Sequence, residues 1–271
     1  MPNRLITLTT DFGTSDYFVG AMKGVIASIA PAARVLDITH EVAPYNILEG
    51  AFTISETAAY FPKGTIHVVV VDPGVGSERR ALLAESAGQF FIAPDNGVLT
   101  LAFQNAPHPY KNRPPKVRVI TNPKFALKDV SRTFHGRDIF APAAGHLARG
   151  AKPAQFGKLI SDYIRIEGAE PTELADNRWR GTIIKADRFG NLITNFHIDD
   201  FFAIKTNPFT MRAGSVVIRR LALTFSDAER GELAVIAGSS GYLEISANQA
   251  SAARELGCGP GSPVELEIEV A

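Results

Sequence analysis

Four aspartates stand where short apolar runs end in the first half of the chain: Asp11, Asp37, Asp72 and Asp95. Each run has the composition of a β-strand, and in an open parallel sheet ligands bind outside the carboxyl ends of the strands. One such aspartate carries little weight, because aspartates at strand ends also cap helices and stabilise turns. Four at one edge of a sheet favour a site for a cation or a diol.

The loop from Asp72 to Arg79, Asp-Pro-Gly-Val-Gly-Ser-Glu-Arg, is a second candidate feature. Gly74 and Gly76 resemble a phosphate-binding loop, but Arg79 stands where the dinucleotide fingerprint has its third glycine. The chain has no GxxxxGK[ST] motif, and Asp72 would repel a pyrophosphate. A dinucleotide oxidoreductase is therefore disfavoured. The loop is short enough for Asp72 and Arg79 to meet, which would hold the acid ionised and fix its orientation.

His135 lies in the segment Phe-His-Gly-Arg-Asp, directly before a predicted helix. A histidine beside a carboxylate can orient or activate a water molecule, whereas a histidine that only begins a helix has the same spacing. Gly136 would allow another backbone or a ligand to approach closely. No set of histidines and cysteines has the spacing of a metal site, so we expect no metal.

The second half carries a segment with an acid, an aromatic ring and an amide, from Asp187 to Asn191. Phe225 and the loop from Gly238 to Tyr242 add another ring and further polar groups. Aromatic faces with amide edges suit a purine. A plain β-turn would contain the same residues, and most such phenylalanines belong to a core, so both interpretations stay open.

The elements that must position these residues alternate in the first half between β-branched runs and helical patterns. This alternation is typical of βαβ units with a mostly parallel sheet. The proline-rich segment from Asn105 to Lys116 predicts a long surface loop. The predicted strands are Leu5 to Thr9, Val35 to Ile38, Thr65 to Val71 and Gln89 to Ala93, and the predicted helices are Ser15 to Ile29, Ile47 to Ala59, Asn96 to Phe103 and Asp138 to His146.

After Trp179 short alternating runs separated by turn residues predict a small antiparallel sandwich or barrel. The sequence thus predicts an α/β N-terminal domain with a mostly parallel sheet, followed by a smaller all-β C-terminal domain. We place the domains at residues 1–165 and 179–271, with a connector at 166–178. The predicted C-terminal strands are Gly181 to Ala186, Leu192 to Phe196, Ser215 to Arg219, Leu233 to Ala237, Tyr242 to Ser246 and Val264 to Val270.

Composition narrows the class of protein. The 271 residues include 28 basic and 28 acidic side chains, which excludes a generic binder of polyanions such as nucleic acid. A hydrophobic fraction of 45% supports a sizeable core. The single cysteine, Cys258, cannot form an internal disulfide, and no run approaches the ~20 apolar residues of a membrane span. We therefore expect a soluble, cytoplasmic protein with a small-molecule substrate and neither a nucleic-acid nor a membrane partner.

Six segments in order resemble the S-adenosyl-L-methionine hydroxide adenosyltransferase family, hydrolases related to the fluorinase and chlorinase. The resemblance covers nearly the whole chain, and both order and spacing match. The segments are Thr10-Asp-Phe-Gly-Thr-Ser-Asp16, Asp72-Pro-Gly-Val-Gly-Ser-Glu-Arg79, Ala93-Pro-Asp-Asn-Gly97, Phe134-His-Gly-Arg-Asp138, Asp187-Arg-Phe-Gly-Asn191 and Ser240-Gly-Tyr-Leu243.

The resemblance implies that water or hydroxide attacks C5′ of the ribose and expels methionine from the sulfonium, giving adenosine and L-methionine. Because the sulfonium is already an activated leaving group, the enzyme needs positioning, a dry pocket and a water, and no metal or cofactor. A positively charged substrate also explains why the strand ends carry acids.

The resemblance also implies roles for individual residues. Asp72, Arg79 and His135 form the catalytic group, and the sequence leaves open which of them takes the proton. The implied substrate-binding residues are Asp11 for the ribose hydroxyls, Asp16 and Asp187 for the methionine ammonium, Phe189 and Phe225 beside the adenosyl group, Tyr45 in place of a fluorinase tryptophan, and Asn191, Ser239 and Asn248 as polar contacts.

Departures from the halogenating relatives favour hydrolysis. Those enzymes resemble this chain but carry tyrosine where Asp72 stands, threonine where Val75 stands and serine where Gly136 stands. A halide must exchange its water for hydroxyl and amide donors, and a carboxylate at that position would repel it. Ser240 also replaces an arginine, so the methionine carboxylate is held differently.

The resemblance further implies a homotrimer whose sites lie between the N-terminal domain of one subunit and the C-terminal domain of its neighbour. A protein that binds adenosine or S-adenosyl-L-methionine as a sensor, without catalysis, is the alternative. A sensor would have no need for Asp72, Arg79 and His135 to aim a water at C5′.

Overall fold

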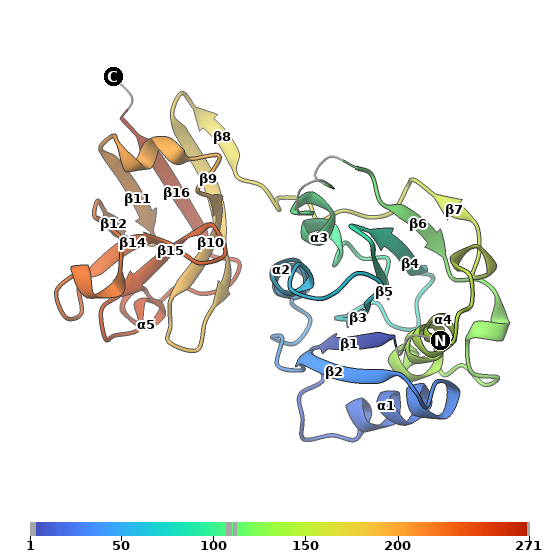
Figure 1. Cartoon of the computed structure of the whole chain (residues 1–271). Coiled ribbons are helices and arrows are strands. Elements are labelled where there is room, and N and C mark those ends of the chain that lie inside the picture. The colour runs from blue at the N-terminus through green and yellow to red at the C-terminus, as the bar shows by residue number, and fades with distance from the viewer. Residues whose placement is uncertain (1–3, 107–109, 111–112, 270–271) are drawn as a thin grey trace. The chain divides into compact units, whose positions relative to one another are not determined.

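The computed structural model of the chain describes residues 4–106, 110 and 113–269. Contacts divide the chain into two compact units, residues 1–166 and 167–271 (Figure 1). No helix within the described residues is long and apolar enough to cross a membrane. Residues 107–109 and 111–112 of the predicted proline-rich loop lie outside the described residues.

The first unit is built on a seven-stranded sheet with the order β2-β1-β3-β5-β4-β6-β7. Its strands are β1 (Leu5–Thr10), β2 (Arg34–Thr39), β3 (Ile66–Val70), β4 (Ala81–Ser86), β5 (Gln89–Pro94), β6 (Lys116–Val119) and β7 (Leu159–Ile160). Its helices are α1 (Phe18–Ile29), α2 (Ile47–Ala58), α3 (Thr100–Gln104) and α4 (Ala141–Ala148), with a π-helical turn at Gly136–Phe140 and 3-10 turns at Pro123–Phe125 and Pro153–Gln155.

This sheet is only partly parallel, so the prediction of a mostly parallel sheet is too strong. Three strand pairs are parallel, β2 with β1, β1 with β3 and β3 with β5. Three are antiparallel, β5 with β4, β4 with β6 and β6 with β7. The direction reverses because β4 and β5 form a hairpin through Ala87 and Gly88, which have φ of 51° and 79°. That pair of positive φ values is what a two-residue hairpin turn requires.

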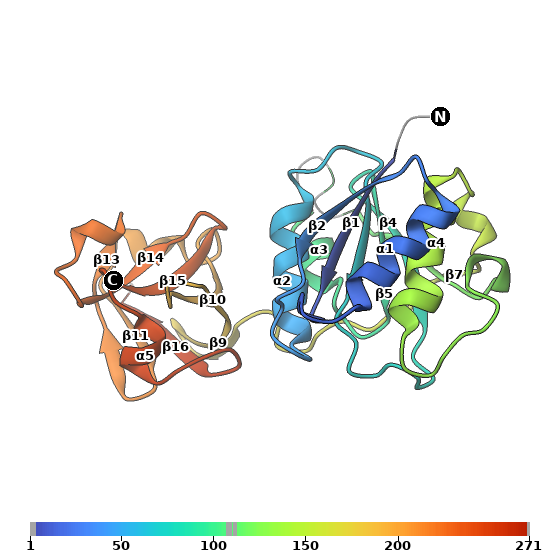
Figure 2. The same cartoon turned by 90° about the horizontal axis from the view of Figure 1, so that it is seen from below.

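Helices cover both faces of the sheet, and the alternation of side chains along β3 shows how (Figure 2). Ile66, Val68 and Val70 belong to one core cluster with residues of α1 and α4. Val69 belongs to the opposite cluster with residues of α2 and α3. Because β3 is buried on both faces, its sequence is apolar apart from the buried His67, which is why the strand could be predicted.

The predicted helices need adjustment at their ends. The first begins at Phe18 instead of Ser15, and the third is confined to Thr100–Gln104. The last helical segment begins two residues earlier than predicted, with the π-helical turn that continues directly into α4. That turn follows His135 directly, which places the histidine at the entry to the helix.

The second unit is one nine-stranded sheet that curls around its own core as a half-barrel, instead of a two-sheet sandwich (Figure 1). The order is β12-β11-β16-β9-β10-β15-β14-β13, with β8 paired to β9; every pair is antiparallel except β13 with β14. The elements are β8 (Thr172–Ala175), β9 (Arg178–Ala186), β10 (Leu192–His197), β11 (Phe209–Ala213), β12 (Val216–Ile218), β13 (Leu221–Ala222), β14 (Leu233–Ala237), β15 (Tyr242–Ala247), α5 (Ala252–Leu256) and β16 (Pro263–Ile268), with 3-10 turns at Phe202–Lys205 and Phe225–Asp227.

Strands β8, β11 and β13 are absent from the sequence prediction, and β8 lies in the stretch expected to be a connector. The unit also contains the short helix α5, so it is not purely β. Ser251 caps α5 by accepting a hydrogen bond from the backbone of Arg254, and Gly257 ends it in the left-handed conformation.

Candidate active site

The loop between β3 and β4 lies at the edge of the sheet where the parallel strands β1, β2, β3 and β5 end. It begins at Asp72, and its first turn is closed by hydrogen bonds from the Val75 nitrogen to the Asp72 oxygen and from Ser77 to the Gly74 oxygen. Gly76 has φ of +79°, and a Cβ there would overlap the carbonyl oxygen of Arg132. Only glycine therefore suits this position, and the turn brings Arg79 back over Asp72.

Asp72 and Arg79 form a buried ion pair, as the short glycine loop predicts. Arg79 Nε donates to both carboxylate oxygens of Asp72 at 3.0 and 2.9 Å, and Nη2 donates to Oδ2. The two side chains are only 5% and 9% exposed. The guanidinium also lies over the ring of Phe140, with Cζ 5.1 Å from its centroid. Both groups are thus fixed in orientation before any ligand arrives.

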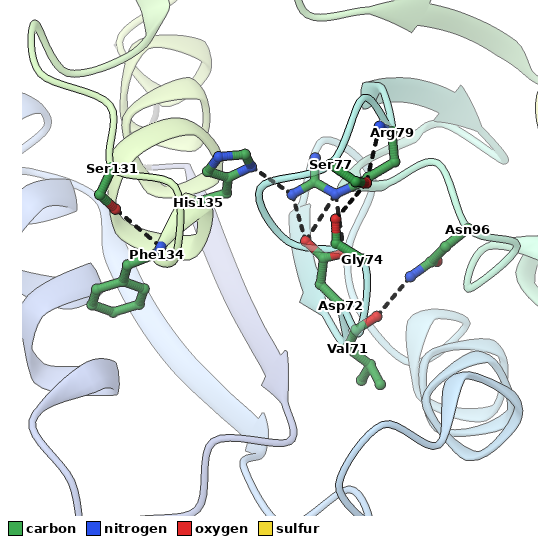
Figure 3. Close-up of polar contacts among 9 residues, drawn as sticks. All are labelled: Val71, Asp72, Gly74, Ser77, Arg79, Asn96, Ser131, Phe134 and His135. Carbon is green, nitrogen blue, oxygen red and sulfur yellow. Dashed lines mark hydrogen bonds and ion pairs between the residues drawn. The ribbon is translucent and has the colours of Figure 1, made fainter.

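His135 completes this group from the other side of the guanidinium (Figure 3). Arg79 Nη2 lies 2.8 Å from His135 Nδ1. Because a guanidinium can only donate, Nδ1 must accept, so the imidazole is neutral and carries its proton on Nε2. Burial and the positive charge of Arg79 lower the pKa of His135, while the negative charge of Asp72 opposes them. At neutral pH the group therefore holds one carboxylate, one guanidinium and one neutral imidazole.

The residues around His135 explain the glycine that follows it. A Cβ on Gly136 would come within 3.2 Å of the Met22 sulfur and 3.3 Å of the rings of Phe12 and Phe134. The absence of a side chain at Gly136 therefore lets Met22 of α1 and Phe12 of the loop before α1 pack closely against it. Phe134 itself is anchored by its backbone nitrogen, which donates to Ser131 Oγ at 3.0 Å.

Asp11 lies near Asp72 at the same edge. Its Oδ2 accepts a hydrogen bond of 2.9 Å from the backbone nitrogen of Tyr45. Burial raises the pKa of Asp11, and the charge of Asp72 adds to that rise. Tyr45 has φ of 67°, an unusual value for a residue with a side chain, and its ring is 72% exposed. Asp16 is exposed in the loop between β1 and α1.

The other two strand-end acids are held by cations of the protein. Asp37 contacts Lys23 Nζ at 2.6 Å and His40 Nε2 at 3.0 Å. His40 in turn lies 2.9 Å from the hydroxyl of Thr10, next to Asp11 in the sequence. Of the four strand-end acids, only Asp11 and Asp72 therefore stay candidates for a shared site. His40 is a neighbour of that site that the sequence did not single out.

Asp95 is paired in a similar way. Arg80 contacts it at 2.6 Å and also contacts Asp162 at 3.0 Å, and the backbone nitrogen of Ile164 donates to Asp95 Oδ1. Its neighbour Asn96 donates a hydrogen bond of 2.8 Å to the carbonyl of Val71, directly before Asp72. The segment after β5 thus supports the β3 strand end from the side (Figure 3).

In the second unit Asp187 organises the hairpin turn between β9 and β10. Its Oδ1 accepts from the backbone nitrogens of Phe189 and Asn191, both at 2.8 Å. Its Oδ2 accepts from Asn191 Nδ2 at 2.9 Å. Gly190 has φ of +87°, and a Cβ there would overlap Ser251. The turn leaves Phe189 78% exposed.

The remaining predicted residues of this unit lie on its other loops. Phe225 is 50% exposed in the 3-10 turn before β14. Ser239 lies in the loop between β14 and β15, which is closed by a hydrogen bond from the Gly241 nitrogen to the Gly238 oxygen. Asn248 Nδ2 donates to the carbonyl of Ala228 at 2.7 Å, so its amide nitrogen supports the Phe225 loop.

Within the described residues no three or more histidine, cysteine, aspartate or glutamate side chains are grouped as metal ligands would be. The first unit offers a clamped carboxylate, a neutral imidazole with an N–H on Nε2, and a second carboxylate at Asp11.

Comparisons with known proteins cover both units. The SAM hydroxide adenosyltransferase N-terminal domain matches residues 6–157, and the corresponding C-terminal domain matches residues 181–265. The chain is 36% identical to the (R)-S-adenosyl-L-methionine hydrolase of Thermus thermophilus, over 97% of this chain and 99% of that protein. It is 28% identical to a fluorinase from an Actinoplanes species, over 92% of each. A solved structure of an uncharacterized conserved protein from Thermotoga maritima matches with a TM-score of 0.85 and 34% identity, over 96% of this chain and 99% of that one.

Proposed function

The chain belongs to the SAM hydroxide adenosyltransferase family, and we propose that it hydrolyses S-adenosyl-L-methionine to adenosine and L-methionine. The observation that carries this proposal is the buried contact of Arg79 with Asp72 on one side and His135 on the other. A site for a cationic substrate gains from a preformed, oriented carboxylate, and attack by water needs groups that fix that water.

In the reaction, the oxygen of a water molecule forms a bond to C5′ of the ribose while the bond from C5′ to sulfur breaks. The electron pair of that bond goes to sulfur, which turns the sulfonium into the neutral thioether of methionine. One proton of the water is released. Because the leaving group is a sulfonium, no Lewis acid is required, and we propose that the enzyme works without a metal or other cofactor.

We propose that Asp72 orients the water by accepting one of its hydrogens. Arg79 engages both oxygens of Asp72, which fixes the orientation of the carboxylate. Since Nδ1 of neutral His135 is used by Arg79, its Nε2–H is the group that would donate to the water oxygen. A carboxylate at Asp72 would repel a halide, which supports hydrolysis over halogenation.

The rest of the substrate is assigned to the remaining residues as a proposal. Asp11, with one oxygen on the Tyr45 backbone, keeps Oδ1 for the ribose hydroxyls. Asp16 and Asp187 would attract the methionine ammonium, and the exposed rings of Tyr45, Phe189 and Phe225 would cover the adenosyl group. Asn191, Ser239 and Asn248 would supply polar contacts.

We also propose a homotrimer in which residues of the two units come together from neighbouring subunits. The large exposed aromatic rings of Tyr45 and Phe189 support this proposal, because such rings gain from being covered. Static light scattering would then give a mass of about three times the 29.2 kDa of one chain. A cytoplasmic location stays a proposal, supported by a single cysteine that cannot form a disulfide within the chain.

Mixing inactive variants tests the shared site. Asp72→Asn and Asp187→Asn chains are produced together, so that mixed trimers contain some sites with both residues intact. Restored hydrolysis in the mixture, absent from either variant alone, supports a site built from two subunits. A mixture as inactive as its components shows that both residues serve a site within one chain.

The function itself is tested with purified protein and S-adenosyl-L-methionine, followed by chromatography for adenosine and methionine. We expect equal amounts of both products, and a loss of about 100- to 10,000-fold in rate for Asp72→Asn. The name of the Thermus thermophilus relative specifies the (R) form. The L descriptor already gives the configuration of the α-carbon, so (R) refers to the sulfonium sulfur. The assay therefore uses the two epimers at sulfur separately. Bound adenosine with unchanged substrate in both proteins would favour the sensor.

A further inference from the structure

Glu244, at the centre of β15, carries a carboxylate that the fold places beside the Asp187 turn. The strand alternates, with Leu243 and Ile245 in the core and Glu244 on the opposite face. Glu244 stands across from Ile193 of β10 and Ile236 of β14, both nearly fully buried. No donor or cation among the described residues contacts its carboxylate.

This carboxylate packs against the loop between β14 and β15. A Cβ on Gly238 would overlap Glu244 Oε1, so the carboxylate lies directly against the backbone of that loop. The same loop carries Ser239, and the buried hydroxyl of its Ser240 finds no hydrogen-bond partner among the residues that the structure describes. A side chain at position 238 would therefore force the end of the Glu244 side chain to move.

A second observation points to a missing ligand. Ser246 lies two residues beyond Glu244 on the same face of β15, is 2% exposed, and its Oγ has no partner within the described residues. Buried polar groups in folded proteins nearly always find a partner. A half-buried carboxylate and two buried hydroxyls, all without partners on one face and its adjoining loop, are the groups that a bound ammonium would satisfy.

Asp187 alone is a poor ligand for that ammonium. Its two oxygens already accept three hydrogen bonds from Phe189 and Asn191, which hold the turn. We propose that Glu244 is a second binding residue for the α-ammonium of the methionine moiety, and that Asp187 shapes the turn and adds negative charge beside it. This inference rests on the proposed function, because it takes the substrate from there.

The ionisation of Glu244 gives the proposal a pH signature. Burial, with a contribution from the charge of Asp187, raises the pKa of Glu244 to about 7. The charged and titratable groups nearest to it on the neighbouring elements include Lys185 across Ile193 on β9, Asp187 and Arg188 in the turn, and His197 across from Tyr242 at the end of β10. Since the ammonium prefers the ionised carboxylate, binding releases a proton, and affinity falls as the pH drops below 7.

The test is calorimetric titration of the full-length protein with L-methionine in the presence of saturating adenosine, and with adenosine alone. For Glu244→Gln we expect methionine affinity to fall about 10- to 100-fold while adenosine affinity is unchanged. Glu244→Asp, which keeps the charge, recovers part of the loss. The matched control is Glu173→Gln, an exposed glutamate on β8 of the same unit, which leaves both affinities unchanged.

Between pH 5.5 and 7.5, methionine affinity of the wild-type protein rises with pH by up to about tenfold per unit, and this slope disappears in Glu244→Gln. If Glu244→Gln kept the methionine affinity of the wild-type protein and its dependence on pH, the inference would be overturned and the proposed function would stay intact. An equal loss of adenosine affinity would also overturn it, by showing that Glu244 supports the fold. A wild-type protein that binds neither compound would overturn the proposed function and this inference together.

Discussion

Arg79 and His135, 56 residues apart in the sequence, meet through a 2.8 Å contact between Nη2 and Nδ1. The same Nη2 also donates to Asp72, so one nitrogen joins the acid after β3 to the histidine before α4. This geometry requires a planar group with several donors in fixed directions, which lysine cannot replace.

Arg79→Lys is therefore expected to lower kcat strongly, by about 100-fold or more, with little change in thermal stability. A single ammonium cannot engage both oxygens of Asp72 and reach His135 at once. The control is Arg80→Lys, at the neighbouring arginine, which pairs with Asp95 and Asp162. Steady-state kinetics of both variants check the prediction, and equal kcat values for the two would contradict the role of Arg79.

The protonation of His135 predicts an acidic limit to kcat. Burial and Arg79 lower its pKa below the ordinary value of 6.5, so the neutral form that accepts from Arg79 persists to a lower pH. Below that pKa the imidazolium can no longer accept, and kcat falls. We expect a midpoint under 6.5, retained in His146→Gln, whose histidine lies on α4 and packs against Phe125. A midpoint at or above 6.5 would contradict the lowered pKa, and a kcat that rises as the pH falls would show that the imidazolium is the active form.

The lowered pKa of His135 also makes the free energy of unfolding depend on pH. In the unfolded chain His135 takes up a proton near pH 6.5, while the folded protein takes it up only at lower pH. Folding therefore loses stability as the pH falls from above 6.5 toward the pKa of the folded state. This loss is smaller in His135→Asn, and thermal unfolding of both proteins between pH 5 and 8 measures the difference.

The glycine loop should tolerate no side chain at Gly76. Gly76→Ala forces a left-handed conformation on alanine and an overlap with Arg132, so we expect a loss of stability above about 1 kcal/mol and a lower kcat. Gly24→Ala is the matched control, since nothing lies within 4 Å of a Cβ there and the residue is in the middle of α1. That change should stabilise the protein by about 0.5–1 kcal/mol. Equal stability of the two variants would contradict the loop geometry.

Replacing Glu56, on α2, is expected to stabilise the protein by an amount that depends on pH. Burial raises its pKa from 4.5 to about 7, so the folded state favours the protonated acid. The acid therefore costs stability increasingly as the pH rises from 4.5 through 7. Glu56→Gln should stabilise the protein at pH 8 by about 1 kcal/mol, after allowing for solvent access, and have no effect near pH 4. Chemical denaturation at the two pH values decides, with a pH-independent effect as the contrary result.

Local sequence signals were sufficient for much of the fold. The apolar run of β3 and the patterns of α1 and α2 predict their elements closely, because each buries a regular set of side chains. The hairpin of β4 was missed because its turn is Ala87-Gly88, without the asparagine or aspartate that usually marks such turns. Without β4 the sheet looks more parallel than it is.

The residues of the site also fall into those that the sequence could predict and those that it could not. The Asp72–Arg79 pair could be predicted because both residues lie in one short loop, and the family resemblance added His135. The pairing of Asp37 with Lys23 and of Asp95 with Arg80 depends on residues from other elements, which spacing does not reveal. Glu244 gave no signal either, because a glutamate in an alternating strand is usually exposed to solvent.

The central claim is that water attacks C5′ of S-adenosyl-L-methionine, and the fate of the water oxygen tests it most directly. The wild-type protein is incubated with the substrate in water enriched in oxygen-18, and the products are measured by mass spectrometry. We predict adenosine with one labelled oxygen at its 5′-hydroxyl, together with an equal amount of unlabelled L-methionine. Unlabelled adenosine, or a nucleoside that still carries sulfur, would contradict the account.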